Sequence, residues 1–237
     1  MKYDLHSRVR FSETDENGRL SLSGLMNYFQ DCSTFQAEDL GIGVDYHKEH
    51  ANAWILIYWQ VILHHMPKLG EHITATTWPY YFKGFHGLRN FTLTDSRGEM
   101  AAWANSFWIL LDVNRQRPVK IPDEELQLYG WDEKLDMDYA PRRVRLPKEA
   151  LLREAEPIRV TPQHLDTNHH VNNGQYVQMA MHSLADGRTP REIRTEYRMQ
   201  ARLGDVIVPG IFEENDSVYV SLHDADGKPY AIVQLLF

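Results

Sequence analysis

Acid, amide and imidazole side chains are concentrated within residues 163–176, QHLDTNHHVNNGQY. Asp166, Asn168 and His170 occupy every second position, so an extended backbone would point their side chains to one side. A helix is expected directly afterwards, and the unpaired N–H groups at its start could hold a developing oxyanion. A carboxylate, an amide and an imidazole at such a place suit acyl transfer, with His170 moving a proton.

Two other interpretations of these residues stay open. Asp and Asn ahead of a helix commonly act as turn and capping residues without any chemistry. A metal site is the second alternative, because His164, His169 and His170 are close in sequence. However, no HxxxH or HxH spacing and no cysteine accompany these histidines, so we expect neither a metal nor a cofactor.

Composition narrows the class of protein. The chain has 237 residues, of which 43% are hydrophobic, which is enough for a sizeable core without disulfides. A net charge of −8 argues against a nucleic-acid partner. The single cysteine fits a reducing compartment, and there is neither a signal-peptide pattern nor a run of about 18 apolar residues. We therefore expect a cytoplasmic protein without a membrane span.

Residues 1–112 predict one strand, one long helix and then an antiparallel sheet. The helix is expected over 22–40, capped by Ser21 or Ser23, because apolar residues recur there at helical spacing. Cys32 falls on this apolar stripe, which indicates a packed core residue rather than a nucleophile. Segments rich in β-branched and aromatic residues, separated by turn signals, then predict four long strands.

The rest of the chain repeats this order after a proline-rich and charged stretch, 113–155, that reads as a surface linker with one short helix. The expected elements are a strand at 157–162, a helix at 173–186, and strands near 192–202, 205–213, 216–224 and 228–237. Placing Asp15 on Asp166 puts Arg19 on His170 without a gap, so the acid has a counterpart and the histidine does not. We expect the chemistry in the second copy, with the first as substrate pocket or scaffold.

Three stretches resemble the acyl-acyl-carrier-protein thioesterase family of plant plastids and bacteria, and the resemblance covers nearly the whole chain. They are ETDENGRLSLSGLMNYFQD, WPYYFKGFHGLRNFTLTDSRGEMAAWANSFWILLD and LDTNHHVNNGQYV, the last carrying the family pattern D-x-N-x-H-V-N-N. The resemblance, closest to the bacterial type, implies an α+β double hot dog fold, in which each of two tandem modules wraps a curved antiparallel sheet around a long helix. The expected divisions are an acyl-pocket or scaffold module at 1–125, a linker at 126–155 and a catalytic module at 156–237.

The resemblance also implies that Asp166, Asn168 and His170 are catalytic, but one family position differs. After the second helix the family has E-Y-R followed by a glutamate and, in plant members, a cysteine, whereas EYRMQA places Gln200 and Ala201 here. A cysteine nucleophile is therefore excluded at that position. Gln200 can orient a water but cannot act as a base, because an amide does not titrate. The base would then be His170 or Asp166, and Gln200 is kept as a fourth site residue.

The function that the resemblance implies is hydrolysis of the fatty acyl-acyl carrier protein thioester, releasing free fatty acid in fatty acid biosynthesis, a part of lipid metabolism. An acyl-CoA thioesterase and a non-catalytic acyl-binding protein are the alternatives. An acidic acyl carrier protein would be the partner, and a homodimer is left open. Candidate basic patches for the carrier are Arg142, Arg143 and Arg145, or Arg188, Arg191 and Arg194.

Overall fold

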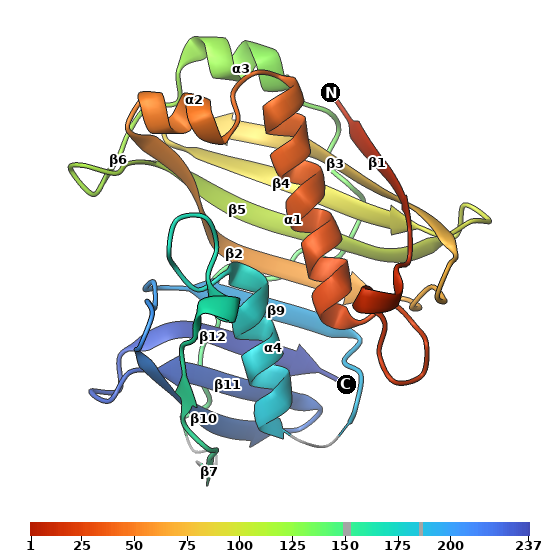
Figure 1. Cartoon of the computed structure of the whole chain (residues 1–237), viewed down its shortest axis with the longest axis vertical. Coiled ribbons are helices and arrows are strands. Elements are labelled where there is room, and N and C mark those ends of the chain that lie inside the picture. The colour runs from red at the N-terminus through yellow and green to blue at the C-terminus, as the bar shows by residue number, and fades with distance from the viewer. Residues whose placement is uncertain (149–152, 185–186) are drawn as a thin grey trace. The chain divides into compact units, whose positions relative to one another are not determined.

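The computed structural model describes residues 1–148, 153–184 and 187–237, and these residues form two compact units. The first unit consists of Met1–Ile57 and Leu63–Tyr139, and the second of Tyr58–Ile62 and Ala140–Phe237. Each unit has one long helix lying on an antiparallel sheet, as Figure 1 shows. This is the arrangement that the repeated order of elements predicts.

The first unit begins with β1 (Tyr3–Arg8), a short 3₁₀ turn η1 (Phe11–Glu13), the long helix α1 (Leu22–Asp39) and the short helix α2 (Val44–Glu49). The strand β2 (Asn52–Leu63) follows, of which residues 58–62 belong to the second unit. The first unit continues with β3 (His72–Lys83), β4 (His86–Thr94), β5 (Met100–Asp112), β6 (Arg117–Pro118) and α3 (Asp123–Tyr129). Neighbouring strands pair antiparallel in the order β1-β3-β4-β5, and β6 pairs with β5.

The start of α1 is fixed by Ser21, whose hydroxyl accepts the N–H of Gly24 at 3.1 Å. Gly41 follows the helix with a φ of +73°, a conformation that glycine adopts without steric cost. The buried face of α1 includes Leu25, Phe29 and Cys32, and the Phe29 ring lies 5.3 Å from that of Phe91 on β4. The Ser21 cap and Gly41 thus bound α1, and burial of its apolar face holds it against the sheet.

The connection after β5 differs from the exposed linker that its prolines and charges indicate. The indole of Trp78 donates to the carbonyl of Glu133 at 2.8 Å, and Asn90 Oδ1 accepts from the Leu135 N–H at 3.1 Å and the Tyr139 hydroxyl at 3.0 Å. Residues 133–139 thus lie against the sheet of the first unit. Composition does not predict this, because Asn90 is a buried polar group that obtains its partners from a distant loop.

The second unit contains β7 (Arg153–Glu154), β8 (Ile158–Arg159), the 3₁₀ turn η2 (Pro162–His164) and the helix α4 (Asn173–Leu184). Its remaining strands are β9 (Glu192–Tyr197), β10 (Val206–Glu214), β11 (Ser217–His223) and β12 (Pro229–Leu236). Antiparallel pairing runs from residues 58–62 of β2 through β9, β12, β11 and β10 to β7. In Figure 1, α4 crosses the strands β10 to β12.

The expected elements of the second unit differ from the observed ones in three places. The strand expected over 157–162 is reduced to β8, Ile158–Arg159, and the turn η2 begins at Pro162. Residues 185–186, the end of the helix expected over 173–186, lie outside the described residues. The strand β9 ends at Tyr197 instead of continuing to residue 202. The N–H groups of Arg198 and Met199 both donate to the carbonyl of Tyr230, at 2.8 and 3.1 Å, so the chain leaves the regular ladder there.

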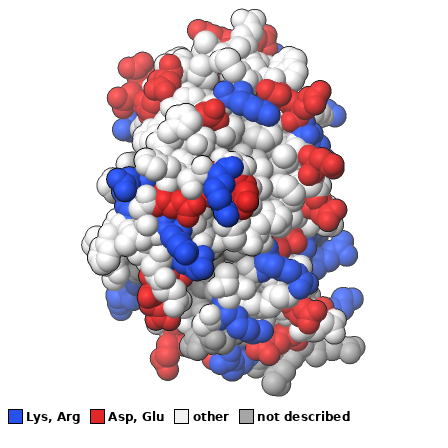
Figure 2. All heavy atoms as spheres, turned by 90° about the vertical axis from the view of Figure 1, so that its right-hand side faces the viewer, with Lys and Arg blue, Asp and Glu red and all other residues white. Residues whose placement is uncertain are grey.

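Charged side chains are spread over the surface. On the face shown in Figure 2, Lys and Arg are interspersed with Asp and Glu, with no large region of one sign. Among the described residues, no helix combines the length and apolar character needed to cross a membrane.

Candidate active site

Asp166 forms a tight turn with the residues that follow it. Its Oδ1 accepts the N–H of Asn168 at 2.8 Å and the N–H of His170 at 3.2 Å, while its own N–H donates to the His170 carbonyl at 2.8 Å. His169 sits in this turn with a φ of +61°. The expected extended segment with three aligned side chains is therefore wrong, because the Asp166 carboxylate pairs with its own backbone and reverses the chain.

The turn leaves His170 half-buried and Asn168 exposed. Burial lowers the pKa of His170; the charge of Asp166 opposes this shift, and Arg202 and His169 add to it. His170 is therefore a neutral imidazole near neutral pH, which is the form that accepts a proton. Among the described residues, none forms a hydrogen bond with a ring nitrogen of His170.

The segment that carries Gln200 runs beside this turn. Val171 donates its N–H to the Ala201 carbonyl at 3.0 Å, and His170 forms a backbone bridge with Arg202. Gln200 is exposed, whereas Ala201 is fully buried. The structure thus brings the 166–170 turn and Gln200 onto adjacent backbone segments, although about 30 residues separate them in the sequence.

The first unit contains the same turn at residues 15–19. Asp15 Oδ1 accepts the N–H groups of Asn17 and Arg19, both at 2.9 Å, and the glycine between them has a φ of +68°. Leu20 donates to the carbonyl of Pro67 at 2.8 Å, as Val171 does to Ala201. By this correspondence Arg19 replaces His170.

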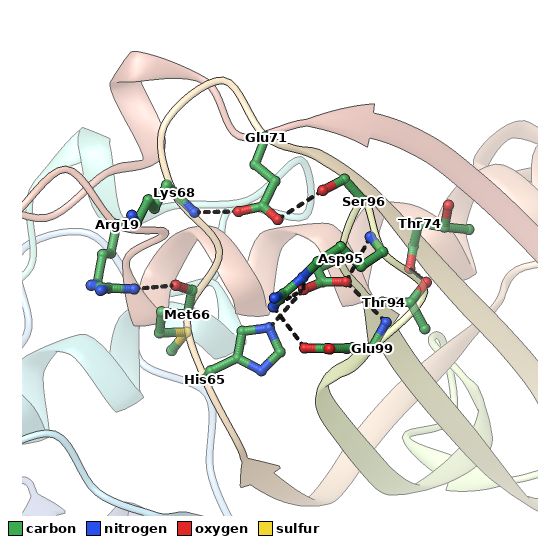
Figure 3. Close-up of polar contacts among 11 residues, drawn as sticks. Arg19, His65, Met66, Lys68, Glu71, Thr74, Thr94, Asp95, Ser96 and Glu99 are labelled. Carbon is green, nitrogen blue, oxygen red and sulfur yellow. Dashed lines mark hydrogen bonds and ion pairs between the residues drawn. The ribbon is translucent and has the colours of Figure 1, made fainter.

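Met66 occupies the position of Gln200 in the first unit, and the Arg19 guanidinium donates to its carbonyl at 3.0 Å (Figure 3). Beside it, His65 Nε2 lies 3.3 Å from Asp95 Oδ2, an imidazole–carboxylate pair that the sequence analysis missed. The carboxylate of Asp95 also binds the Arg97 guanidinium at 3.1 Å. Because the Asp95 carboxylate also pairs with Arg97, we assign it no role in activating His65. The His65–Asp95 pair instead links the loop after β2 to the turn between β4 and β5.

Other side chains considered for chemistry are held in structural roles. His164 accepts the Thr161 N–H on Nδ1 at 3.0 Å, and no three His, Cys, Asp or Glu side chains of the described residues are grouped to hold a metal. Cys32 is buried, with its sulfur 3.3 Å from the Ala75 carbonyl, and burial raises its pKa to about 12. Cys32 therefore stays a thiol, consistent with a packed core residue.

Tyr176 on α4 contacts the Gln200 segment, a role that the sequence analysis did not find. Its hydroxyl oxygen accepts the N–H of Ala201 at 2.9 Å. Helical periodicity places Tyr176 on the buried face of α4 but contains no signal for a polar contact 25 residues away.

The geometry defines a two-unit protein with a double hot dog fold, in which only the second unit has a histidine in the repeated turn. Solved structures share this fold. An acyl-ACP thioesterase from Bacteroides thetaiotaomicron has a TM-score of 0.89 at 21% identity, covering 100% of this chain and 97% of that one. A 12:0-ACP thioesterase from Umbellularia californica has a TM-score of 0.85 at 18% identity, covering 99% and 96%.

The family follows from two matches along the chain. The acyl-ACP thioesterase N-terminal domain matches residues 1–129, and the acyl-ACP thioesterase C-terminal domain matches residues 149–228. The chain belongs to the acyl-ACP thioesterase family.

Curated relatives are also distant in sequence, at 23 to 26% identity. A palmitoyl-acyl carrier protein thioesterase of Cuphea hookeriana is 26% identical over 202 residues, which cover 78% of this chain and 46% of that protein. Oleoyl-acyl carrier protein thioesterase 1 of Arabidopsis thaliana is 23% identical over 226 residues, covering 84% and 60%. The chain thus spans about half the length of the curated relatives that it matches.

Proposed function

We propose that the chain hydrolyses the thioester of a fatty acyl-acyl carrier protein and releases the free fatty acid, as a step of fatty acid biosynthesis. The observation that carries this proposal is the half-buried His170 in the 166–170 turn, paired with the backbone segment that holds Gln200. Burial lowers the pKa of His170, which favours the imidazole form that accepts a proton. Membership of the family supplies the substrate class. Three further points stay predictions. They are a cytoplasmic location, a homodimer, and a division into modules at 1–125 and 156–237 with a linker at 126–155.

In the proposed reaction, a water molecule held by the Gln200 amide attacks the carbonyl carbon of the thioester. His170 accepts the proton of the water as the new C–O bond forms, and Asn168 donates from its amide to the carbonyl oxygen. Asp166 maintains the turn and offsets the charge of the imidazolium. The tetrahedral intermediate then breaks its C–S bond, and the proton on His170 passes to the leaving thiolate, which gives a fatty acid and the carrier thiol.

The acidic carrier requires basic side chains that are free to meet it. Arg194 is already bound, through its Nε to the Tyr58 hydroxyl at 3.2 Å and through Nη1 to Gln234 at 2.7 Å. Arg143 and Arg145 are exposed on either side of the buried Val144. These two arginines are the best candidates for the carrier contact, because Val144 holds the backbone between them.

The test is a panel of fatty acyl thioesters of increasing chain length, each on acyl carrier protein and on coenzyme A, with release of the thiol measured. We expect hydrolysis with a higher kcat/KM on the carrier protein. Replacing Arg143 and Arg145 by Glu should raise KM for the carrier substrate about 10-fold and leave the coenzyme A substrate unchanged. Release of no thiol from any substrate, with acyl chains still bound, would instead indicate an acyl-binding protein.

A further inference from the structure

A hydrogen bond between the Tyr176 hydroxyl and the Ala201 N–H connects the helix α4 to the segment that carries Gln200. Both residues are buried, with exposed fractions of 2% and 0%. The N–H of Ala201 donates to the hydroxyl of Tyr176 at 2.9 Å, and its carbonyl accepts from Val171 at 3.0 Å. Ala201 is therefore fixed on one side by α4 and on the other by the chain that leaves the 166–170 turn, and Gln200 directly precedes it.

The first unit lacks this bond for a chemical reason. The counterparts of Tyr176 and Ala201 are Leu25 and Pro67, and a leucine has no acceptor while a proline has no N–H. The backbone bond from Leu20 to Pro67 is nevertheless present at 2.8 Å. The fold thus forms the same backbone pairing without a tyrosine, so the hydroxyl is not a requirement of the architecture.

A second tyrosine strengthens the arrangement. Tyr197, at the end of β9, donates its hydroxyl to the carbonyl of Asn173 at 3.0 Å, and its ring packs edge-on against that of Tyr176 at 5.9 Å. Residues 198–201 are therefore anchored to α4 at both ends. Because Gln200 lies within this short anchored segment, the position of its backbone depends on these contacts.

We propose that Tyr176 is a positioning residue that, through the Ala201 N–H, fixes Gln200 beside the His170 turn in the geometry that holds the attacking water. This proposal rests on the proposed function and adds a residue to it. Small displacements of a positioned group reduce catalysis strongly, since an error of about 1 Å costs up to about 10²-fold. Burial raises the pKa of Tyr176 to about 12, so the hydroxyl keeps its proton near neutral pH.

The first test is a double-mutant cycle between Tyr176→Phe and Gln200→Ala, with the rate of thioester hydrolysis measured for all four proteins. We expect Tyr176→Phe to lower kcat about 10-fold with KM within about 2-fold, and to change kcat by less than about 2-fold when Gln200 is already alanine. The pH at which activity is half-maximal should not move. An equal loss in both backgrounds would overturn the positioning role and leave only a stabilising one.

Tyr219→Phe is the matched control, because it removes a tyrosine hydroxyl of the same unit that bonds Gln234, at 3.0 Å, and not residues 198–201. It should keep kcat within about 3-fold. Hydrogen exchange at the Ala201 amide should become faster in Tyr176→Phe and not in Tyr219→Phe. Faster exchange at Ala201 with an unchanged kcat would also refute the proposal.

A paired variant separates catalysis from folding. Tyr176→Leu with Ala201→Pro copies the residues of the first unit and removes donor and acceptor together, so no buried polar group is left unpaired. We expect this protein to fold and to lose about 10-fold in kcat, and wild-type turnover in it would contradict a positioning role. If the wild-type protein hydrolyses no thioester, both the proposed function and the positioning role are refuted. Faster exchange at Ala201 in Tyr176→Phe would then show that the hydrogen bond only stabilises the fold.

Discussion

The two units form the same turn at residues 15–19 and 166–170 and differ in the side chains that the turn presents. In both, an aspartate oxygen accepts two backbone N–H groups at 2.8 to 3.2 Å. The first unit then offers Arg19 with its guanidinium on a carbonyl, and the second offers a neutral His170. The backbone is thus shared, and the capacity to move a proton is confined to one copy.

The hairpin turns of the sheets extend this comparison. Asp95 and Asp224 also accept the N–H groups two and four residues further along the chain, at 2.8 to 3.0 Å. Four aspartates therefore make the same pattern, and the proposed chemistry uses only one of them, Asp166. An aspartate that caps a turn is consequently weak evidence for a catalytic carboxylate, and His170 carries the assignment.

The largest expected effect comes from replacing, by alanine, the residue that distinguishes the two turns. His170→Ala should lower kcat by about 10² or more, because it removes the general acid–base group, whereas Arg19→Ala should leave kcat within about 2-fold. Steady-state kinetics on an acyl carrier substrate would measure both. A folded and fully active His170→Ala protein would mean that the active site is elsewhere.

The second prediction concerns pH. Because His170 must be unprotonated to act as a base and burial lowers its pKa, kcat/KM should rise with pH through a midpoint below the ordinary histidine value of about 6.5. Asp166→Asn keeps an oxygen for the turn but removes a charge that raises this pKa, so the midpoint should move still lower. Asp15→Asn is the control and should leave the profile unchanged. A midpoint that rises in Asp166→Asn would contradict the electrostatic argument.

The third comparison is between Gln200 and its counterpart Met66. Gln200→Glu restores the family carboxylate at an exposed position, so kcat should be retained or raised, by up to about 10-fold, with stability changed by less than about 0.5 kcal/mol. Met66→Glu should not alter kcat. Kinetics combined with thermal unfolding would measure these effects, and a strong loss in Gln200→Glu would show that Gln200 does not hold the water.

The smallest effect is expected at Cys32. Since its thiol is buried on α1 and stays protonated, Cys32→Ala should keep turnover near wild type and reduce stability by about 1 kcal/mol or less. Denaturant unfolding and kcat would be compared. If a folded Cys32→Ala protein lost its turnover, the hypothesis that Cys32 is the nucleophile would have to be taken up again.

The sequence predicts the regular elements well where the apolar periodicity is bounded by residues that begin and end a helix or strand. The helix expected over 22–40 is observed as Leu22–Asp39, because an apolar stripe lies between a capping serine and a glycine. The helix α2 is missed, since its six residues bury no side chain and therefore carry no apolar pattern. Periodicity reports burial, and short exposed helices leave no trace in it.

The candidate site is predicted less completely. Residue types locate the 166–170 turn, but alternation favours a strand where the structure has a chain reversal, because the sequence does not reveal whether a carboxylate pairs with its own backbone. The contact of Tyr176 with Ala201 is equally hidden, as it depends on the approach of two separate elements. Catalytic roles for Asp166 and the other site residues stay predictions.

The repeated turn also bears on how such a protein can diverge after an internal duplication. Its shape depends on one aspartate and on main-chain groups, so side chains at the third and fifth positions can drift without loss of the fold. A copy can therefore lose or regain an imidazole through one substitution, at the fifth residue of the turn, as Arg19 and His170 illustrate. The side chains of one turn can therefore change while the backbone of both turns is kept.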